Sequence, residues 1–165
     1  MNHAKKVQAV DGLEPGEQVL SALFVRPSGG TAQVVGGAAG GLVGAGIAGL
    51  MGRRKRQAAG DENAAATVEG NATKLRVTAP GYVALTDRRW LVLNQAPMSG
   101  KPKEIVATLA HQDVSAIAFE KGALVGSASV RCADGSVEPL ELPRGNPVEE
   151  FASAANSVGC TATVA

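Results

Sequence analysis

The residues whose type and spacing most clearly indicate a chemistry are four consecutive cations, Arg53, Arg54, Lys55 and Arg56. Clustered Lys and Arg side chains attract anionic lipid headgroups, and each contributes about 1 kcal/mol of binding when it lies close to the surface. Four of them give useful but reversible attachment. The cluster therefore predicts contact with an anionic membrane surface.

The basic cluster follows an apolar run over residues 32–52, in which Gln33 is the polar exception. A small residue recurs there at every fourth position: Gly36, Gly40, Gly44, Ala48 and Gly52. On a helix these residues form one smooth ridge that a second helix can approach closely, as in a glycine zipper. Such a helix would be about 32 Å long, near the hydrocarbon thickness of a bilayer.

The position of this run argues against a simple membrane crossing. It separates a predicted strand at 18–26 from strands that begin near residue 81, and one crossing would leave the first strand on the wrong side of the bilayer. Its many glycines also lower helix propensity, by about 1 kcal/mol each relative to alanine. Three interpretations stay open: an interfacial or re-entrant hairpin on anionic lipid, a helix that self-associates through its ridge, and a flexible or packed loop.

The elements around the run predict one mainly β domain. Apolar stretches with strand composition occur at 18–26, 81–86, 89–94, 104–109, 114–119, 125–132 and 136–142. Asp87 and Arg88 form a tight turn between two of them, and Asp134-Gly135 provides the positive φ of another. The sequence predicts seven strands, with Trp90 in the core.

One C-terminal helix follows the strands. Asn146 is its expected N-cap, Pro147 its first helical residue, and Glu149 completes a capping box. Val148, Phe151, Ala155 and Val158 share one face before Gly159. This apolar stripe predicts a helix that docks on the sheet.

Composition excludes several classes of function. The chain has 165 residues, a net charge of +1 and 3% aromatic residues, which gives neither the charge nor the stacking surface expected for binding nucleic acid. His111 is expected in a surface turn, and Cys132 and Cys160 as inert thiols. No catalytic residue, metal site or cofactor is predicted. With two cysteines and no secretory signal at residues 1–12, we expect a cytoplasmic protein.

The segment 81–93, GYVALTDRRWLVL, together with GEQVL at 16–20, the Asp134-Gly135 hairpin and the closing helix, resembles bacterial pleckstrin-homology-like domains close to the GRAM type. The resemblance implies a seven-stranded bent sheet or barrel capped by the helix, formed by residues 13–30 and 74–159. A polar leader (1–12), a glycine-rich helical insert with a basic end (31–57), a polar linker (58–73) and a tail (160–165) complete the expected organisation.

Such domains are as a rule non-enzymatic scaffolds, membrane-peripheral adaptors or oligomerisation units. The usual first hairpin loop is replaced here by the insert, so Arg53–Arg56 occupy the position of a basic binding loop. We therefore expect a PH-like module that associates peripherally with the cytoplasmic membrane face. The alternative is a scaffold or protein-binding domain that forms a homo-oligomer through its glycine-rich helix.

Overall fold

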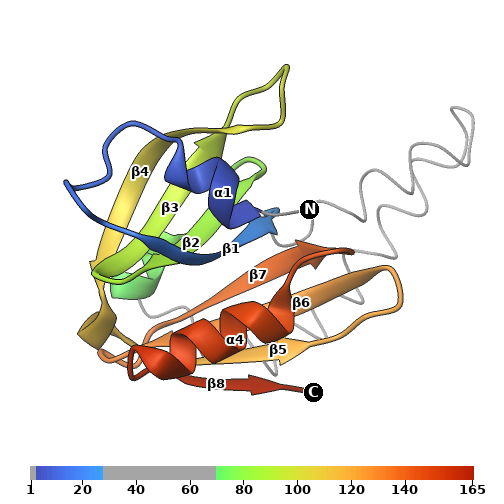
Figure 1. Ribbon diagram of the computed structural model, residues 1–165. Helices are drawn as coiled ribbons and strands as arrows, with labels where there is room; N and C mark the ends of the chain where they lie inside the picture. The colour runs from blue at the N-terminus through green and yellow to red at the C-terminus, as the bar shows by residue number, and fades with distance from the viewer. Residues whose placement is uncertain (1–2, 28–69) are drawn as a thin grey trace, which may run out of the picture.

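The computed structural model describes residues 3–27 and 70–165 (Figure 1). Two sheets and a helix near the C-terminus make up most of this part, which confirms a mainly β fold with a C-terminal helix. The elements, in chain order, are α1 (His3–Gln8), β1 (Val19–Val25), η2 (Asn71–Leu75), β2 (Gly81–Thr86), β3 (Arg89–Gln95), β4 (Pro102–Ala110), η3 (His111–Asp113), β5 (Val114–Glu120), β6 (Val125–Cys132), β7 (Val137–Pro143), α4 (Val148–Ser157) and β8 (Thr161–Val164).

The first sheet is an antiparallel meander of four strands in the order β1-β2-β3-β4. Its central hairpin turns at Asp87 and Arg88, as the sequence predicts, with Leu85 paired to Trp90. The hydroxyl oxygen of Thr86 accepts the backbone N–H groups of Arg88 (3.1 Å) and Arg89 (2.9 Å), which fixes the turn. All six residues of β2 are buried, because both faces of this sheet are covered.

The second sheet has the order β7-β6-β5-β8. β5, β6 and β7 are antiparallel, and β8 adds to β5 in the parallel direction. Gly135 has a φ of 84° in the β6–β7 turn, which confirms the expected hairpin. The two sheets meet where Arg26, just after β1, bridges to Glu141 of β7.

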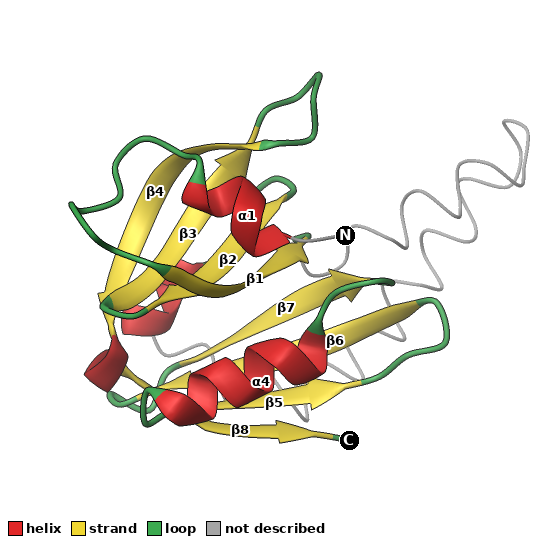
Figure 2. Ribbon diagram, in the orientation of Figure 1, coloured by secondary structure: helices red, strands yellow, loops and turns green. Residues whose placement is uncertain are grey.

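The main core lies between the two sheets, and α4 packs into it beside β1 and β8 (Figures 1 and 2). Phe151 of α4 joins the sheets: its ring centroid lies 5.6 Å from that of Trp90 on β3 and 6.2 Å from that of Phe119 on β5. All three side chains are fully buried. This confirms that the apolar stripe of the helix docks on the sheets and that Trp90 is a core residue.

The structure corrects the expectations for the two chain ends. Residues 1–12 are not simply a polar leader, because α1 places Val7 in a second apolar cluster on the outer face of the first sheet, with Tyr82 and Leu91. Residues 160–165 are not a tail, because 161–164 form β8. The described residues therefore contain eight strands, where seven were expected.

The start of α4 also differs from its prediction. The helix begins at Val148, Pro147 occupies the N-cap position, and no side chain caps it, so the expected capping box with Glu149 is absent. The side chain of Asn146 is bound elsewhere: it accepts the N–H of Phe24 at 2.7 Å and donates to the Phe24 carbonyl oxygen at 2.9 Å. It satisfies the open edge of β1 in preference to the helix terminus.

Candidate functional site

The predicted lipid-contact and helix-packing residues lie outside the described residues. These are Arg53, Arg54, Lys55 and Arg56 of the basic cluster, and Gly36, Gly40, Gly44, Ala48 and Gly52 of the ridge. The description stops at Pro27, just after β1, and resumes at Gly70, just before η2. The segment with the predicted lipid-contact residues leaves the described part of the chain at the end of β1. The described residues around that end are therefore the first place to look for a membrane-contact surface.

Three loops connect the strand ends that lie on the same side of the two sheets as the end of β1. Val25 of β1 pairs with Gly81, and Gly81 pairs with Asn94, so the β3–β4 loop lies at this end. The bridge from Arg26 to Glu141, and the pairing of Val125 with Pro143, bring the β5–β6 and β7–α4 loops to the same end. We call residues 96–101, 121–124 and 144–147, together with Arg26 and Pro27, the loop end; in Figure 1 the first of these loops projects at the top, and the other two lie at the right.

Two large apolar side chains project into solvent at the loop end. Met98, in the β3–β4 loop, is 100% exposed, and Leu124, in the β5–β6 loop, is 77% exposed. They are the two most exposed large hydrophobic side chains of the described part. Single exposed apolar side chains are common on protein surfaces, so these two mark the loop end as a candidate contact surface and gain significance only together with other features of that end.

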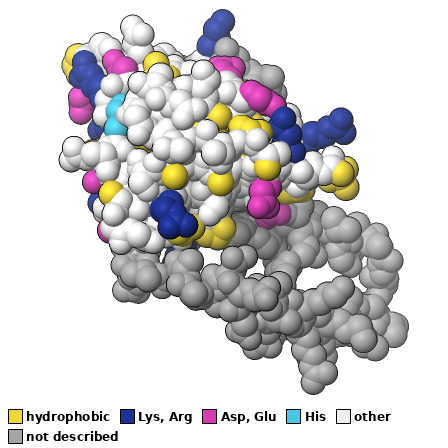
Figure 3. All heavy atoms as spheres, turned by 90° about the horizontal axis from the view of Figure 1, so that it is seen from below, with side chains coloured by type: hydrophobic (Ala, Val, Ile, Leu, Met, Phe, Trp, Pro, Cys, Tyr) yellow, Lys and Arg dark blue, Asp and Glu magenta, His cyan; other side chains and the backbone are white. Residues whose placement is uncertain are grey.

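Basic side chains accompany these tips. Lys101 and Lys103 follow Met98 in the chain, and Lys121 and Arg144 lie in the other two loops; all four are exposed. Lys121 forms an ion pair with Glu149 of α4, so part of this charge is neutralised. Seen from below, basic and hydrophobic side chains lie next to one another at the right-hand edge of the coloured atoms (Figure 3).

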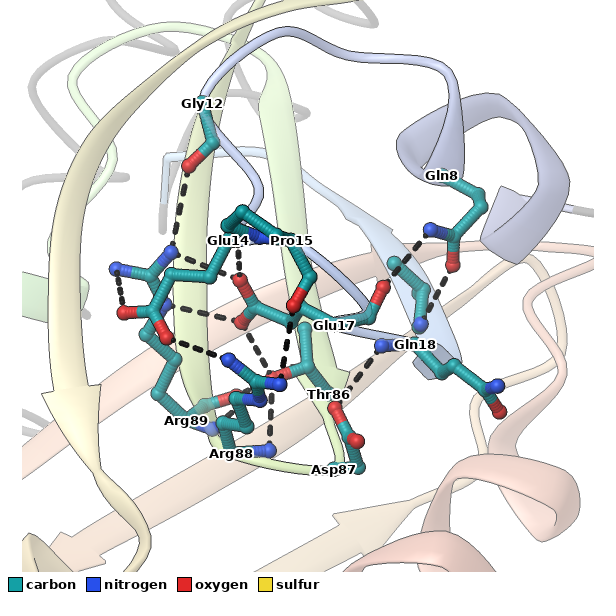
Figure 4. Close-up of polar contacts among 11 residues, drawn as sticks. Gln8, Gly12, Glu14, Pro15, Glu17, Gln18, Thr86, Asp87, Arg88 and Arg89 are labelled. Carbon is teal, nitrogen blue, oxygen red and sulfur yellow. Dashed lines mark hydrogen bonds and ion pairs between the residues drawn. The ribbon is translucent and has the colours of Figure 1, made fainter.

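The opposite end of the first sheet carries a polar network around Glu17 (Figure 4). Arg89 donates to both carboxylate oxygens of Glu17, at 2.9 and 2.8 Å, and the hydroxyl of Thr86 donates to one of them at 2.8 Å. The hydrogen bonds from Arg89 are the main reason that the pKa of Glu17 falls to about 2. Both carboxylate oxygens of Glu17 accept hydrogen bonds, so this buried, ionised side chain has a structural role: it links the start of β1 to the β2–β3 hairpin.

The other residues weighed in the sequence are also in structural positions. His111 is the first residue of the short helix η3, and its Nε2 lies 3.0 Å from the carbonyl oxygen of Thr86. Cys132 and Cys160 are free and buried. Over residues 3–27 and 70–165 no three His, Cys, Asp or Glu side chains are grouped to hold a metal ion. Within the same ranges no helix is long and apolar enough to cross a membrane.

Sequence reasoning missed Met98 and Leu124. A signal for Met98 was present, because a lone methionine between Pro97 and Ser99-Gly100 sits in turn chemistry, where no core can bury it. Leu124 begins the apolar run of β6 and could be read as part of that strand. The structure places Leu124 in the loop, because β6 begins at Val125.

Comparison with known proteins gives no family assignment. No protein-family profile matches the sequence, and no curated protein matches it significantly. The function is therefore argued from the loop end itself.

Proposed function

We propose that this chain is a non-enzymatic, PH-like module that attaches peripherally to an anionic surface, the cytoplasmic face of a membrane. It does so through its loop end and through the basic insert that follows β1 in the sequence. The observation that carries the proposal is the pair of exposed side chains, Met98 and Leu124, at the end of the molecule where the chain leaves β1 for residues 28–69.

The strand order supports the PH-like part of the proposal. Four strands form one antiparallel meander, the next three form a second, and a helix then packs between the sheets. The resemblance implies seven strands in a bent sheet or barrel capped by a C-terminal helix, and a mainly β fold with such a helix is consistent with it. The parallel strand β8 and the helix α1 are additions to that pattern.

The free energy of membrane binding would come from several weak interactions together. Burial of a Met or Leu side chain contributes at most about 1.5–3 kcal/mol, and each cation near an anionic surface about 1 kcal/mol. One cation of the loop end, Lys121, is paired with Glu149, and Arg53–Arg56 would add four positive charges to the attraction. Apolar tips and a basic segment together provide the two signals that stable peripheral attachment requires.

The test is co-sedimentation with vesicles of increasing anionic lipid content. Three chains are compared: the intact protein, a chain in which residues 32–57 are replaced by a short Gly-Ser linker, and the double variant Met98→Ser/Leu124→Ser. Circular dichroism establishes that each is folded. We expect binding that rises with anionic lipid and falls in both altered chains.

Binding by none of the three chains would overturn the proposal. Charge reversal at Arg53–Arg56 separates it from the alternative, a scaffold that self-associates through the ridge Gly36–Gly52. Release from vesicles supports membrane attachment, whereas a lipid-independent oligomer that survives the charge reversal supports the scaffold.

A further inference from the structure

A cleft of about 360 Å³ lies between α1, the segment that follows it and the start of β4. We call it the lysine cleft, because Lys6, Lys101 and Lys103 line it, together with Asp11. Since α1 is an addition to the PH-like pattern, the resemblance does not imply this cleft. Its volume corresponds to about twelve water molecules, which leaves room for a phosphate group and a small esterified alcohol.

Tyr82 of β2 anchors both walls of the lysine cleft. Its hydroxyl donates to the carbonyl oxygen of Gly100 at 2.7 Å, next to Lys101 in the chain. The N–H of Ala96 donates to the carbonyl oxygen of Lys101 at 2.8 Å, which closes the base of the β3–β4 loop. On the other wall, Val7 of α1 packs in the same apolar cluster as Tyr82. The backbone on both sides is therefore held in place without a ligand.

The charged side chains of the lining have an excess of positive charge. Three lysines against one aspartate give the lining a net charge of +2. The ion pairs formed among the described residues do not involve Lys101 or Lys103. The acid beside them in the chain, Glu104, is outside the lining and accepts a hydrogen bond from Asn94 at 3.3 Å. A bound dianion would supply the counter-charge.

A phosphate monoester fits this requirement better than other common anions. It carries a charge of about −1.5 to −2 near neutral pH and has three strong acceptor oxygens. A carboxylate or a phosphate diester brings a single negative charge. Lysine binds phosphate as a compact charge on a flexible stem, so exposed lysines on two walls can turn toward one group.

We propose that the lysine cleft binds the phosphate monoester group of a ligand, with the ammonium groups of Lys6, Lys101 and Lys103 on its terminal oxygens. The group can belong to a lipid, since Lys101 and Met98 share the β3–β4 loop, or to a soluble phosphate ester. For a lipid headgroup the inference rests on the proposed function, whereas for a soluble ester it stands without it.

Two soluble probes of similar size test the cleft on the full chain: methyl phosphate, a monoester, and dimethyl phosphate, a diester. Each is titrated at pH 7.5 and constant ionic strength while the amide signals of Asp11, Lys101 and Lys103 are followed by NMR. We expect methyl phosphate to bind about fivefold more tightly, because it brings a second negative charge to the cations. Equal binding of the two probes, or binding of neither, overturns the proposal.

Lysine variants and a matched control locate the bound phosphate. Lys101→Gln and Lys103→Gln should each weaken methyl phosphate binding about threefold, and the double variant about tenfold. Both side chains are exposed, so the variants should keep the fold, which their NMR spectra check. Lys74→Gln makes the same change of charge at an exposed residue of η2 outside this lining and should have no effect. Undiminished binding by the double variant contradicts the site.

Vesicles distinguish the two sources of the phosphate group. Phosphatidic acid presents a monoester and phosphatidylglycerol a diester, and the two vesicle preparations are matched in zeta potential. Preference for phosphatidic acid that is lost in Lys101→Gln/Lys103→Gln identifies a lipid headgroup. Equal binding to both vesicles, with methyl phosphate still bound, assigns the cleft to a soluble ester. Absence of vesicle binding would overturn the proposed function, while the methyl phosphate titration still decides the cleft.

Discussion

Arg89 grips the carboxylate of Glu17 with two hydrogen bonds, from Nε at 2.9 Å and from Nη2 at 2.8 Å. Glu17 lies just before β1, and Arg89 is the first residue of β3. The pair therefore joins the entry of the chain to the central hairpin. The Glu17 side chain is fully buried, while 22% of the Arg89 side chain is exposed, so the buried charge has its counter-ion at the surface.

This pair predicts a loss of stability in acid. Glu17 has a folded pKa of about 2 against a reference of 4.5, so its contribution is complete above pH 4.5 and disappears as the pH falls toward 2. The shift corresponds to about 3 kcal/mol of unfolding free energy. Urea unfolding measured between pH 6 and pH 2 should show this decline.

Two variants assign the acid sensitivity. Glu17→Gln should lower the unfolding free energy at pH 7 by about 3 kcal/mol, because it breaks a buried ion pair, and should flatten the pH dependence. Glu14→Gln, at a half-exposed carboxylate that contacts Arg88, should preserve the decline. An undiminished slope in Glu17→Gln would show that another carboxylate is responsible.

Asn146 carries the second prediction. Its amide nitrogen donates to the carbonyl oxygens of Phe24 and Pro143, at 2.9 and 2.8 Å, and its oxygen accepts the N–H of Phe24. Asn146→Ala leaves these groups unpaired and should cost about 2–3 kcal/mol. Asn146→Asp brings a carboxylate against two carbonyl oxygens, so it should be at least as destabilising at pH 7. Thermal unfolding of both variants checks this, and an Asp variant as stable as wild type would contradict the hydrogen-bond assignment.

The local signals in the sequence were sufficient for β1 to β7 and for their hairpins. Asp87-Arg88 and Asp134-Gly135 turn where predicted, because turn chemistry and apolar runs act over a few residues. The role of Asn146 could not be foreseen, since its partner Phe24 is 122 residues away and capping was the local alternative. Similarly, 161–164 is short and lacks an apolar run, and only its contact with β5 makes it a strand.

The candidate sites were harder to predict than the fold. Met98 and Leu124 matter because strand pairing brings their loops to one end, which no local pattern encodes. Likewise, Lys6 and Lys101 share a cleft only because α1 folds back onto the first sheet.

Met98 gives the third prediction. Because its side chain is fully exposed, Met98→Ser should change the unfolding free energy by less than about 0.5 kcal/mol. The same change should weaken partitioning to anionic vesicles by roughly tenfold, as expected when an apolar side chain no longer enters the lipid. Val106→Ser, at a 49% exposed side chain within β4, is the matched control and should leave partitioning unaltered. Equal losses in both variants would point to general hydrophobicity rather than to the loop end.

The two cysteines give the last prediction. Cys132 pairs with Val114 on one side of β5, and Cys160 directly precedes β8, which pairs with Ala116 on the other side. The two cysteines thus belong to opposite sides of β5, and both are free thiols. Burial is the main cause that raises the pKa of Cys160 to about 11, and it also raises that of Cys132.

Both thiols should therefore resist iodoacetamide in the folded protein. They should react only when local unfolding exposes them to solvent. Cys160 should react first, because it directly precedes β8, a strand of four residues at the edge of its sheet, where local opening costs less than in the sheet interior. Labelling at pH 8 followed by peptide mass spectrometry measures the order, with the urea-unfolded protein as the reference for full reactivity. Rapid labelling of Cys132, or a disulfide formed in the folded protein with oxidised glutathione, would contradict the register of β5 between them.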